Sequence, residues 1–500
     1  MIEFRNFIDG QWREFAGSTV SVDDPSTGEI IGTIPDSSAT DVDAAVTAAR
    51  RAFTEGSWAR MSPSDRAEVL RRLATALESR FDELVDGLIA DTGCSARMCP
   101  MLQAGAPLAH LRDFADMALL LTKPVSFPIQ TTPGFGQWEL HREPVGVVGA
   151  FTPYNFPLFI AVWKAAPALL AGNTVVIKSS PLTPYGVDAL ARAAAEAGLP
   201  PGVLNVVHGD RVAGEALVDH SGVDLVTFTG STAIGKRVMS AAAATAKEVV
   251  LEMGGKSPAV VLPDADVELA VRGTLFSSMM HGGQACVATT RMLVPDSRYD
   301  EFVELLERRA SDLVVGPAPE FTTDVGPVIS AAQRDKVEKF VTSAVEQGAR
   351  VLVGGERPTG VPEGGHYVAP TVLVDMAHDN VAACEEIFGP VLSVLRYSDV
   401  DEAVRIANDT QYGLAASVWS SDVERAREVA GRIEGALVWI NDVAQADVAR
   451  TPFAGKKQSG VGTELGADGL FSYTKVKSLY TALDRDLDAR PYGAVGSEWE

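Results

Sequence analysis

The sequence predicts an α/β protein with two domains, each built on a parallel β-sheet covered by helices. A chain of 500 residues is too long for one ordinary hydrophobic core, so two large domains are expected. From about residue 145, short continuous apolar runs alternate with alanine-rich segments of helical periodicity. Continuous runs are typical of strands buried on both faces, and their alternation with helices predicts parallel crossovers. After Lys256 the same alternation begins again, which predicts a second α/β unit.

Two helices are predicted before the alternation, over residues 41–53 and 63–91. The second begins at Ser62-Pro63, where a capping serine precedes a proline in the first helical position. Its apolar residues recur at helical spacing over the whole range.

Five apolar runs are predicted to form the first sheet. They are residues 145–150, 174–177, 203–207, 225–228 and 249–251. Four crossovers in series predict that all five strands lie in one Rossmann-like parallel sheet. A nucleotide site is expected at the carboxyl ends of such strands.

The second unit is predicted to begin with a strand at 258–262, a helix from about residue 266 and a strand at 292–294. Residues 351–370 are rich in Gly and Pro and predict an irregular excursion. Two segments outside the alternation, 137–143 and 473–480, alternate apolar with polar side chains and predict ribbon-like strands. Proteins normally cover such strand edges, so a homo-oligomer is expected.

The composition excludes several classes of partner. Lys and Arg number 43 against 66 Asp and Glu, a formal charge of −23, whereas nucleic-acid surfaces and polybasic membrane contacts need clustered cations. Four cysteines are few for a disulfide framework, and no Cys or His pair completes a metal site beside Cys94 and Cys99. No signal peptide or membrane-length apolar run is present, so a cytoplasmic location is expected.

The candidate catalytic residues are Cys286, Glu252 and Asn155. Cys286 and Glu252, a possible thiol nucleophile and a possible carboxylate base, are each set in glycine-rich backbone. Asn155 offers an amide donor between Pro153 and Pro157. A buried Cys is more often an inert apolar side chain, which is our interpretation of the other three cysteines. Asn155 alone would be read as a turn residue.

A candidate phosphate site lies in Phe228–Lys236. A strand is predicted to end at Gly230 and a helix to begin near Ser231, which would present free N–H groups to an anion. The alternative is an ordinary turn with a serine cap. The G-x-G-x-x-G and G-x-S-x-G motifs are absent, and Gly255-Lys256 fails the Walker pattern because Val250 stands where its first glycine is required.

Together these segments resemble the aldehyde dehydrogenase superfamily, in its NAD(P)-dependent hydrolytic form. The resemblance runs nearly end to end, with the motifs in the family's order. They are Pro153–Pro157, Lys178, Phe228–Ser231, Glu252–Lys256, Gly283–Cys286, Glu386–Pro390 and Pro452–Gly460. Met253 stands where Leu is usual, and Ala454 where Gly is usual.

The resemblance implies a role for each motif. Cys286 would be the nucleophile, Glu252 the general base, and Asn155 an oxyanion donor together with the backbone N–H of Cys286. The residues implied to hold the cofactor are Lys178, Gly230, Ser231, Gly235, Glu386 and Phe388. Phe156 and Trp163 stand at positions that line the aldehyde tunnel in the family, and the alternative is that both belong to the core.

The implied reaction is oxidation of an aldehyde to the carboxylic acid with NAD(P), through a thiohemiacetal and a thioester on Cys286. One alternative is a coenzyme A-acylating semialdehyde dehydrogenase, against which the presence of Glu252 argues. Another is a catalytically silent structural homologue, against which the complete catalytic set argues. The aldehyde is not identified, because the loop from Asn441 to Arg450 varies with substrate. Its Asp442 and Asp447 would suit a cationic aldehyde, but exposed loop charge is the alternative.

Pro181 is the departure that bears on the cofactor. The family often carries a carboxylate three residues after the cofactor lysine, where it pairs with ribose hydroxyls and repels a 2′-phosphate. Here that position is Pro181, and Ser179 and Ser180 offer hydroxyl donors beside it. NAD is therefore expected as the cofactor, with NADP tolerated.

The resemblance also implies a domain plan. Residues 1–125 and 145–256 would form the cofactor-binding domain, and 257–458 the catalytic domain. Residues 126–144 and 472–500 would form a small β oligomerisation element and an extended tail. That element would extend a neighbour's sheet in a homodimer or homotetramer.

Overall fold

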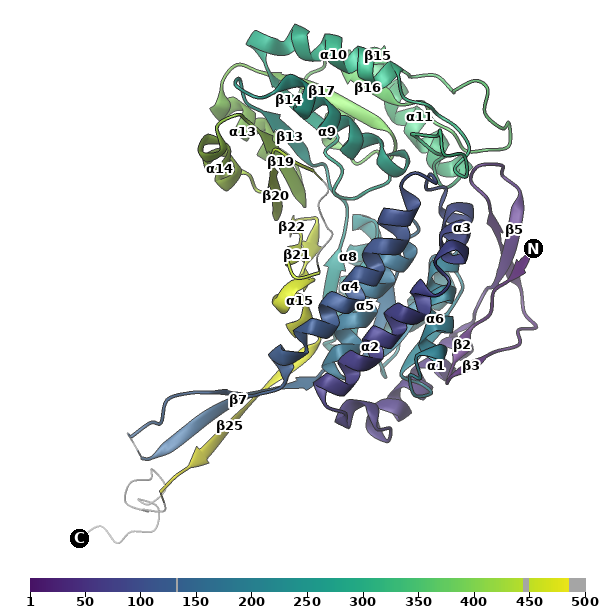
Figure 1. Cartoon of the computed structure of the whole chain (residues 1–500), viewed down its shortest axis with the longest axis vertical. Coiled ribbons are helices and arrows are strands. Elements are labelled where there is room, and N and C mark those ends of the chain that lie inside the picture. Colours follow the sequence, from purple (N-terminus) through teal and green to yellow (C-terminus); the bar gives the residue numbers. More distant parts are fainter. Residues whose placement is uncertain (132–133, 444–448, 485–500) are drawn as a thin grey trace.

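The computed structural model describes residues 1–131, 134–443 and 449–484. Figure 1 shows two α/β lobes and a long two-stranded arm that projects from one of them. The predicted fold class is confirmed. Among the described residues, no helix combines the length and the apolar content that crossing a membrane requires.

The first lobe contains an eight-stranded sheet in the order β23-β12-β11-β8-β9-β10-β2-β3. The five predicted strands are β8 (Val147–Phe151), β9 (Thr174–Lys178), β10 (Leu204–Val207), β11 (Leu225–Thr229) and β12 (Glu248–Glu252). Neighbours among them pair in parallel, as predicted. From β8 the chain builds β9 and β10 on one side and β11 and β12 on the other. The strand order therefore reverses beside β8, which is where ligands bind in sheets of this kind.

Three antiparallel edge strands of this sheet were not predicted. They are β2 (Phe7–Ile8), β3 (Gln11–Trp12) and β23 (Gly460–Val461). Each has two residues, which is too short to show a period in the sequence. β23 lies beyond residue 458 and returns the chain from the second lobe to the first sheet.

Helices cover both faces of the first sheet. They are α1 (Ala39–Thr54), α2 (Pro63–Glu78), α3 (Phe81–Thr92), α4 (Ala106–Asp116), α5 (Pro157–Ala171), α6 (Tyr185–Glu196), α7 (Arg211–Asp219) and α8 (Thr232–Ala242). The single helix predicted over 63–91 is wrong, because the chain breaks into α2 and α3 at Ser79 and Arg80. Both helices bury an apolar face in the same core, so the apolar pattern continues across the break.

The second lobe contains a seven-stranded sheet in the order β15-β16-β17-β14-β13-β19-β20. Its strands are β13 (Pro258–Val261), β14 (Arg291–Pro295), β15 (Arg350–Val353), β16 (Thr371–Val374), β17 (Val391–Tyr397), β19 (Ala415–Trp419) and β20 (Leu437–Ile440). Its helices are α9 (Val267–Met279), α10 (Tyr299–Ser311), α11 (Ala331–Glu346), α12 (Val381–Cys384), α13 (Val400–Asn408) and α14 (Val423–Arg432). Only β15 runs antiparallel to its neighbour. The segment between β15 and β16 has no helix or strand, as predicted for most of 351–370.

Smaller elements complete the chain. They are β1 (Ile2–Glu3), β4 (Thr19–Asp23), β5 (Ile30–Pro35), β18 (Tyr412–Gly413), β21 (Phe453–Ala454), β22 (Lys456–Lys457), β24 (Thr463–Glu464) and α15 (Gly466–Phe471).

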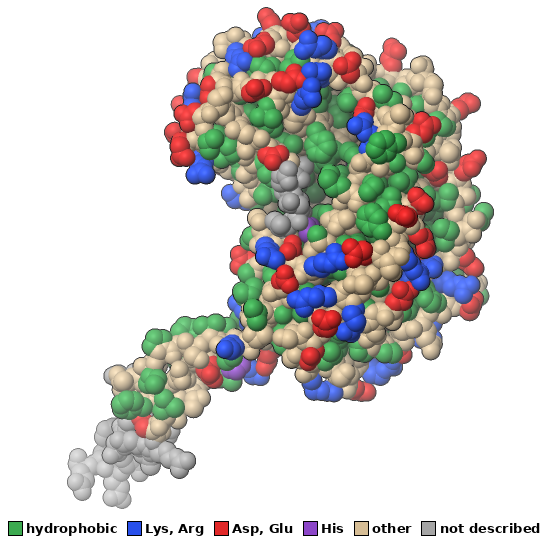
Figure 2. All heavy atoms as spheres, viewed as in Figure 1, with side chains coloured by type: hydrophobic (Ala, Val, Ile, Leu, Met, Phe, Trp, Pro, Cys, Tyr) green, Lys and Arg blue, Asp and Glu red, His purple; other side chains and the backbone are tan. Residues whose placement is uncertain are grey.

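The projecting arm consists of β7 (Gly136–Pro144) and β25 (Thr474–Ala482), with β6 (Val125–Ser126) on the other edge of β7. The two predicted ribbon strands are confirmed, and they pair with each other antiparallel along their whole length. The arm carries exposed apolar side chains, which Figure 2 shows along its length. The extended tail predicted at 490–494 lies outside the described residues.

Candidate active site

A cavity of about 730 Å³ lies at the carboxyl edge of the first sheet. The ends of β8, β9, β11 and β12 contribute to its walls, as expected for a nucleotide site in a sheet of this topology. Among the predicted site residues, those that line it are Asn155, Phe156, Lys178, Gly230, Ser231, Cys286, Glu386 and Phe388. The sheet therefore brings together residues that are up to 233 positions apart in the sequence (388 − 155).

Cys286 lies on a loop that follows a short turn of 3₁₀-helix, Met280–Gly283. Gly283 has a φ of +71°, and a Cβ there would stand 2.1 Å from the carbonyl oxygen of Gly389. Gly255 is similar, since a Cβ would stand 2.5 Å from the carbonyl oxygen of Cys286. The backbones of the motifs around Glu252, Cys286 and Glu386 thus lie so close together that a side chain at Gly255 or Gly283 would not fit, which explains why these positions are glycine.

The Cys286 side chain is partly exposed in the cavity. Burial of the thiol, together with the nearby carboxylates of Glu252 and Glu386, raises the pKa of Cys286 to about 12. Cys286 is therefore protonated at neutral pH before substrate binds, and it must lose a proton to act as a nucleophile.

Asn155 is held directly beside the nucleophile loop. The side-chain Nδ2 of Asn155 donates to the backbone carbonyl oxygen of Gln284 at 2.7 Å. The backbone carbonyl oxygen of Asn155 accepts from Nε2 of Gln103 at 2.7 Å. Because an amide nitrogen carries two donors, one N–H remains for a ligand. The buried Asn155 side chain is thus fixed to Gln284, which precedes Cys286 by two residues in the loop.

Glu252 is the last residue of β12 and is buried, with 3% of its surface exposed. Neither carboxylate oxygen has a hydrogen-bond partner among the described residues. Burial raises the pKa of Glu252 well above its usual value, the nearby Glu464 adds to the rise, and Lys164 opposes it. A carboxyl group that is buried and uncommitted in this way is suited to taking up a proton.

A buried ion pair lies behind Glu252. The side chains of Lys164 and Glu464 are fully buried, their charged atoms are in contact, and Thr227 hydrogen-bonds to both. This pair was not predicted from the sequence. The signal for Lys164 is a single lysine within the otherwise apolar α5, whose charge must find a partner when buried.

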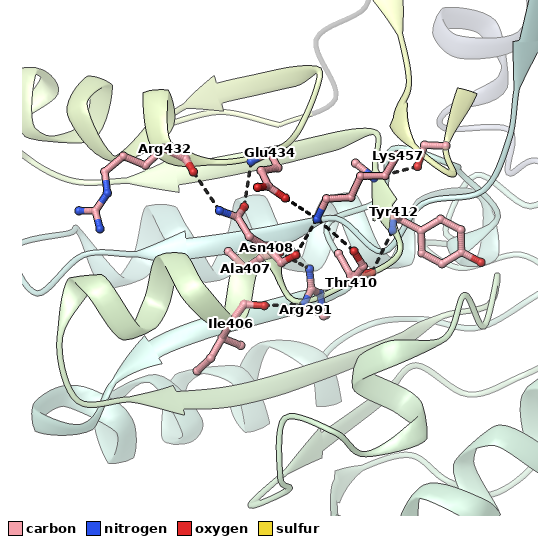
Figure 3. A network of polar contacts seen from close by, with 11 residues as sticks. Arg291, Ile406, Ala407, Asn408, Thr410, Tyr412, Arg432, Glu434 and Lys457 are labelled. Carbon is pink, nitrogen blue, oxygen red and sulfur yellow. Dashed lines mark hydrogen bonds and ion pairs between the residues drawn. The ribbon is translucent and has the colours of Figure 1, made fainter. Parts of the chain in front are cut away.

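The segment Pro452–Gly460 supports the turn that follows Glu252. Ser459 Oγ donates to the carbonyl oxygen of Gly254 at 2.7 Å, and the Ser459 carbonyl oxygen accepts from the N–H of Met253 at 2.8 Å. Figure 3 shows how the neighbouring Lys457 is anchored, with Nζ donating to the carbonyl oxygens of Asn408 (2.6 Å) and Thr410 (3.1 Å). This late motif therefore acts on the site by holding backbone in place.

Lys178 ends β9 and lies nearly buried in the cavity wall. Burial lowers the pKa of Lys178 to about 8, while Asp210 and Asp36 act in the opposite direction. Two strands away, the side chain of Ser231 does not cap α8, so the predicted alternative of a serine cap is not observed. The N–H groups of the first turn of α8 are therefore open to the cavity.

Glu386 and Phe388 close the cavity from the second lobe. Oε1 of Glu386 accepts from the N–H of Gly255 at 2.9 Å, and Phe388 has a left-handed φ of 60°. Nε2 of Gln333 fixes this conformation by donating to the carbonyl oxygens of Ile387 (3.1 Å) and Phe388 (2.8 Å). A strained non-glycine residue held in this way is typical of a binding site. Gln333 lines the cavity and was not predicted.

The comparisons with known proteins agree with this geometry. The model of the aldehyde dehydrogenase family matches residues 12–479. The chain belongs to the aldehyde dehydrogenase family. It is 42% identical over 475 residues to a geranial dehydrogenase of Castellaniella defragrans, covering 95% of this chain and 98% of the relative. It is 39% identical over 483 residues to a betaine aldehyde dehydrogenase of Bacillus subtilis, covering 95% and 96%.

Solved structures show the same relationship. A crystal structure of a Mycobacterium tuberculosis aldehyde dehydrogenase complexed with NAD+ superposes with a TM-score of 0.92 at 41% identity, covering 95% of this chain and 98% of that chain. The predicted resemblance to the aldehyde dehydrogenase superfamily is therefore confirmed.

Three predicted site residues of this family member do not line the cavity, namely Glu252, Gly235 and Trp163. Gly235 is buried, and a Cβ there would stand 2.4 Å from Sδ of Met253, so this glycine lets α8 pack closely on β12. Trp163 is 3% exposed, its ring lies 4.9 Å from that of Phe453, and its Nε1 donates to Nδ1 of His110 at 2.7 Å.

Phe156 does line the cavity, and it is linked to Trp163 by Phe159, whose ring centroid lies 5.8 Å from that of Phe156 and 4.8 Å from that of Trp163. An aromatic cluster thus extends away from Cys286 into the first lobe. Asp442 is exposed, and Asp447 lies outside the described residues.

Proposed function

We propose that the chain oxidises an aldehyde to the carboxylic acid with NAD, through a thiohemiacetal and then a thioester on Cys286. The observation that carries this proposal is that Cys286 and Asn155 meet in one cavity, beside the buried and uncommitted carboxyl group of Glu252. The domain plan in this proposal is the one expected from the sequence, with the cofactor domain in the first lobe and the nucleophile in the second.

The residues of the cavity fit a dinucleotide. The uncapped N-terminus of α8 offers N–H donors for a pyrophosphate, and the buried hydroxyl of Thr229 lines the cavity without a hydrogen-bond partner in the described chain. Lys178, Gly230, Ser231, Glu386 and Phe388 are the residues proposed to hold the cofactor. NAD, when bound, supplies the acceptor for the hydride that leaves the aldehyde carbon.

The chain's own groups perform the remaining chemistry. Cys286 first releases its thiol proton to solvent in the cavity, and the resulting thiolate adds to the aldehyde carbon. The oxyanion that forms accepts from the free N–H of Asn155 and from the backbone N–H of Cys286. Each donor of this kind is worth about 2.7–4 kcal/mol of transition-state stabilisation. Once the hydride has left, Glu252 takes a proton from the water that attacks the thioester, and the acid is released.

A direct test is the formation of reduced NAD on addition of an aldehyde, with and without coenzyme A. We expect turnover and release of a carboxylic acid without coenzyme A, because Glu252 is present to activate water. The panel should include an apolar and a cationic aldehyde, since the two named relatives act on geranial and betaine aldehyde. A strict need for coenzyme A would favour the acylating alternative. Absence of any turnover across the panel would favour a silent homologue.

We also propose that the protein assembles through its arm. Apolar side chains of the arm are exposed, including Val125 at 58% and Val476 at 55%, and Ile129 between β6 and β7 is exposed at 55%. Isolated two-stranded ribbons are marginally stable in water, so a second subunit is expected to cover this one. Sedimentation at micromolar concentration should give a dimer or a dimer of dimers. A species of one 52.9 kDa chain would contradict the proposal.

A further inference from the structure

We propose that Asp210 selects NAD over NADP, by presenting its carboxylate beside Lys178, where the adenosine ribose of the cofactor would bind. The carboxylate would accept from the ribose hydroxyls and repel a phosphate on the 2′ oxygen. This inference rests on the proposed function, because it concerns the same cofactor. The expectation that NADP is tolerated rested on Pro181, which stands where the family often has a carboxylate. In this proposal Asp210, which follows another strand, supplies that carboxylate.

Sheet topology brings Asp210 to Lys178. The strands β9 and β10 are parallel neighbours, and their register pairs Lys178 with Val207. Asp210 follows Val207 by three residues, at the start of α7. Adjacent strands lie about 4.8 Å apart, so the segment after β10 runs beside the segment after β9. Lys178, Pro181 and Asp210 accordingly line the same cavity.

The carboxylate of Asp210 is uncommitted. Asp210 occupies the N-cap position of α7, where an aspartate normally accepts from the helix N–H groups, but its side chain makes no capping bond. In the part of the chain that the structure describes, the side chain has no hydrogen bond or ion pair, although its backbone N–H donates to Oδ1 of Asp36 at 3.4 Å. Both oxygens are therefore available as acceptors, and Asp36 adds a second negative charge close by.

Several groups that would favour a phosphate are already engaged, although the Ser180 hydroxyl, which accepts from the N–H of Leu182 at 3.2 Å, still lines the cavity as a donor. The hydroxyl of Ser179 is buried and hydrogen-bonded to Nδ1 of His208 at 2.7 Å, which corrects its prediction as a free donor. Arg211 and Arg237, the two arginines in the cavity wall, both donate to Oε1 of Glu215 at 2.8 Å. Because both guanidinium groups share the one carboxylate of Glu215, this cluster keeps a single net positive charge.

Lys178 is weakened as a phosphate ligand as well. Because burial lowers the pKa of Lys178 to about 8, a fraction of its ammonium groups is neutral at pH 8. A neutral amine can still hydrogen-bond to a ribose hydroxyl, whereas a phosphate needs the charge. Around Lys178 itself, the two carboxylates of Asp210 and Asp36 outnumber the one ammonium group, and this local balance opposes the 2′-phosphate.

The test is the binding of two adenosine fragments, 5′-AMP and adenosine 2′,5′-bisphosphate, by isothermal titration calorimetry without aldehyde. The ratio of their dissociation constants isolates the cost of the 2′-phosphate. In Asp210→Asn we expect the bisphosphate to gain about tenfold or more relative to 5′-AMP, as for removal of one close and partly screened charge. NADP+ should gain relative to NAD+ in the same direction.

Two matched variants complete the design. Asp300→Asn removes the same charge from an exposed position in the first turn of α10, in the second lobe and away from the cavity wall, and should leave the ratio nearly unchanged. Asp210→Glu keeps the charge and should retain the preference of the native chain. Equal ratios in the native protein and Asp210→Asn would overturn the inference, as would an Asp210→Glu variant that behaves like Asp210→Asn. If the native chain bound neither 5′-AMP nor NAD+, the proposed function itself would fail.

Discussion

Replacement of Cys286 by alanine is expected to abolish aldehyde oxidation while leaving NAD binding nearly intact. The Cys286 sulfur forms the covalent bond in the proposed reaction, and no other cysteine lines the cavity. Loss of a catalytic nucleophile typically lowers the rate by on the order of 10⁴-fold or more. The cofactor is held by other segments, chiefly the ends of β9 and β11, which this substitution does not touch.

The measurement is kcat/KM with one good aldehyde, together with the dissociation constant for NAD. Cys384→Ala is the matched control, because Cys384 lies on α12 and its Sγ contacts only the carbonyl oxygen of His378 among the hydrogen bonds described. It should retain native activity. Appreciable turnover by Cys286→Ala would remove Cys286 from the role of nucleophile.

The strands that build the cavity were predictable because their signal is local. Each of the five strands β8 to β12 is a continuous apolar run, and such runs show burial on both faces without reference to the rest of the chain. The break between α2 and α3 was not predictable from apolar spacing. Both helices bury their apolar faces in one core, so the spacing continues through the turn at Ser79 and Arg80.

Cys286 and Glu252 were predictable because each stands in a glycine-rich segment whose backbone must approach another segment closely, and Asn155 because two prolines bracket it. Their supporting partners were not, because those partners come from distant parts of the chain. Glu464 meets Lys164 across 300 positions, and Gln103 meets Asn155 across 52. No spacing rule relates such pairs before the fold is known.

Asp210 illustrates the same limit for specificity. The sequence directs attention to Pro181, which stands three residues beyond Lys178, the last residue of β9. Asp210, which lines the same cavity as Lys178, instead follows the neighbouring strand, and only the order of β9 and β10 in the sheet places it there. A functional position can therefore be filled from a strand that sequence numbering does not connect to it.

Replacement of Glu252 by glutamine is expected to separate the two halves of the reaction. Gln has the shape of Glu but cannot accept the proton of the attacking water, so oxidation can proceed while hydrolysis of the thioester is blocked. Rapid mixing should show a burst of about one equivalent of reduced NAD per active site, followed by a steady state that is at least about a hundredfold slower. Glu385→Gln, which changes an exposed carboxylate on the neighbouring segment, should show native turnover.

The rate of thioester hydrolysis in the native protein is expected to rise with pH. Burial and Glu464 raise the pKa of Glu252, and a general base acts only when ionised. Hydrolysis of the thioester should therefore be slow below that raised pKa and should accelerate as the pH increases through it. In Glu252→Gln this rise should disappear, leaving only the slow attack of water or hydroxide from solution. A variant that kept full steady-state activity, or kept the native rise with pH, would show that another group activates the water. The buried carboxyl group of Glu252 would then belong, with Lys164 and Glu464, to the structural support of β12.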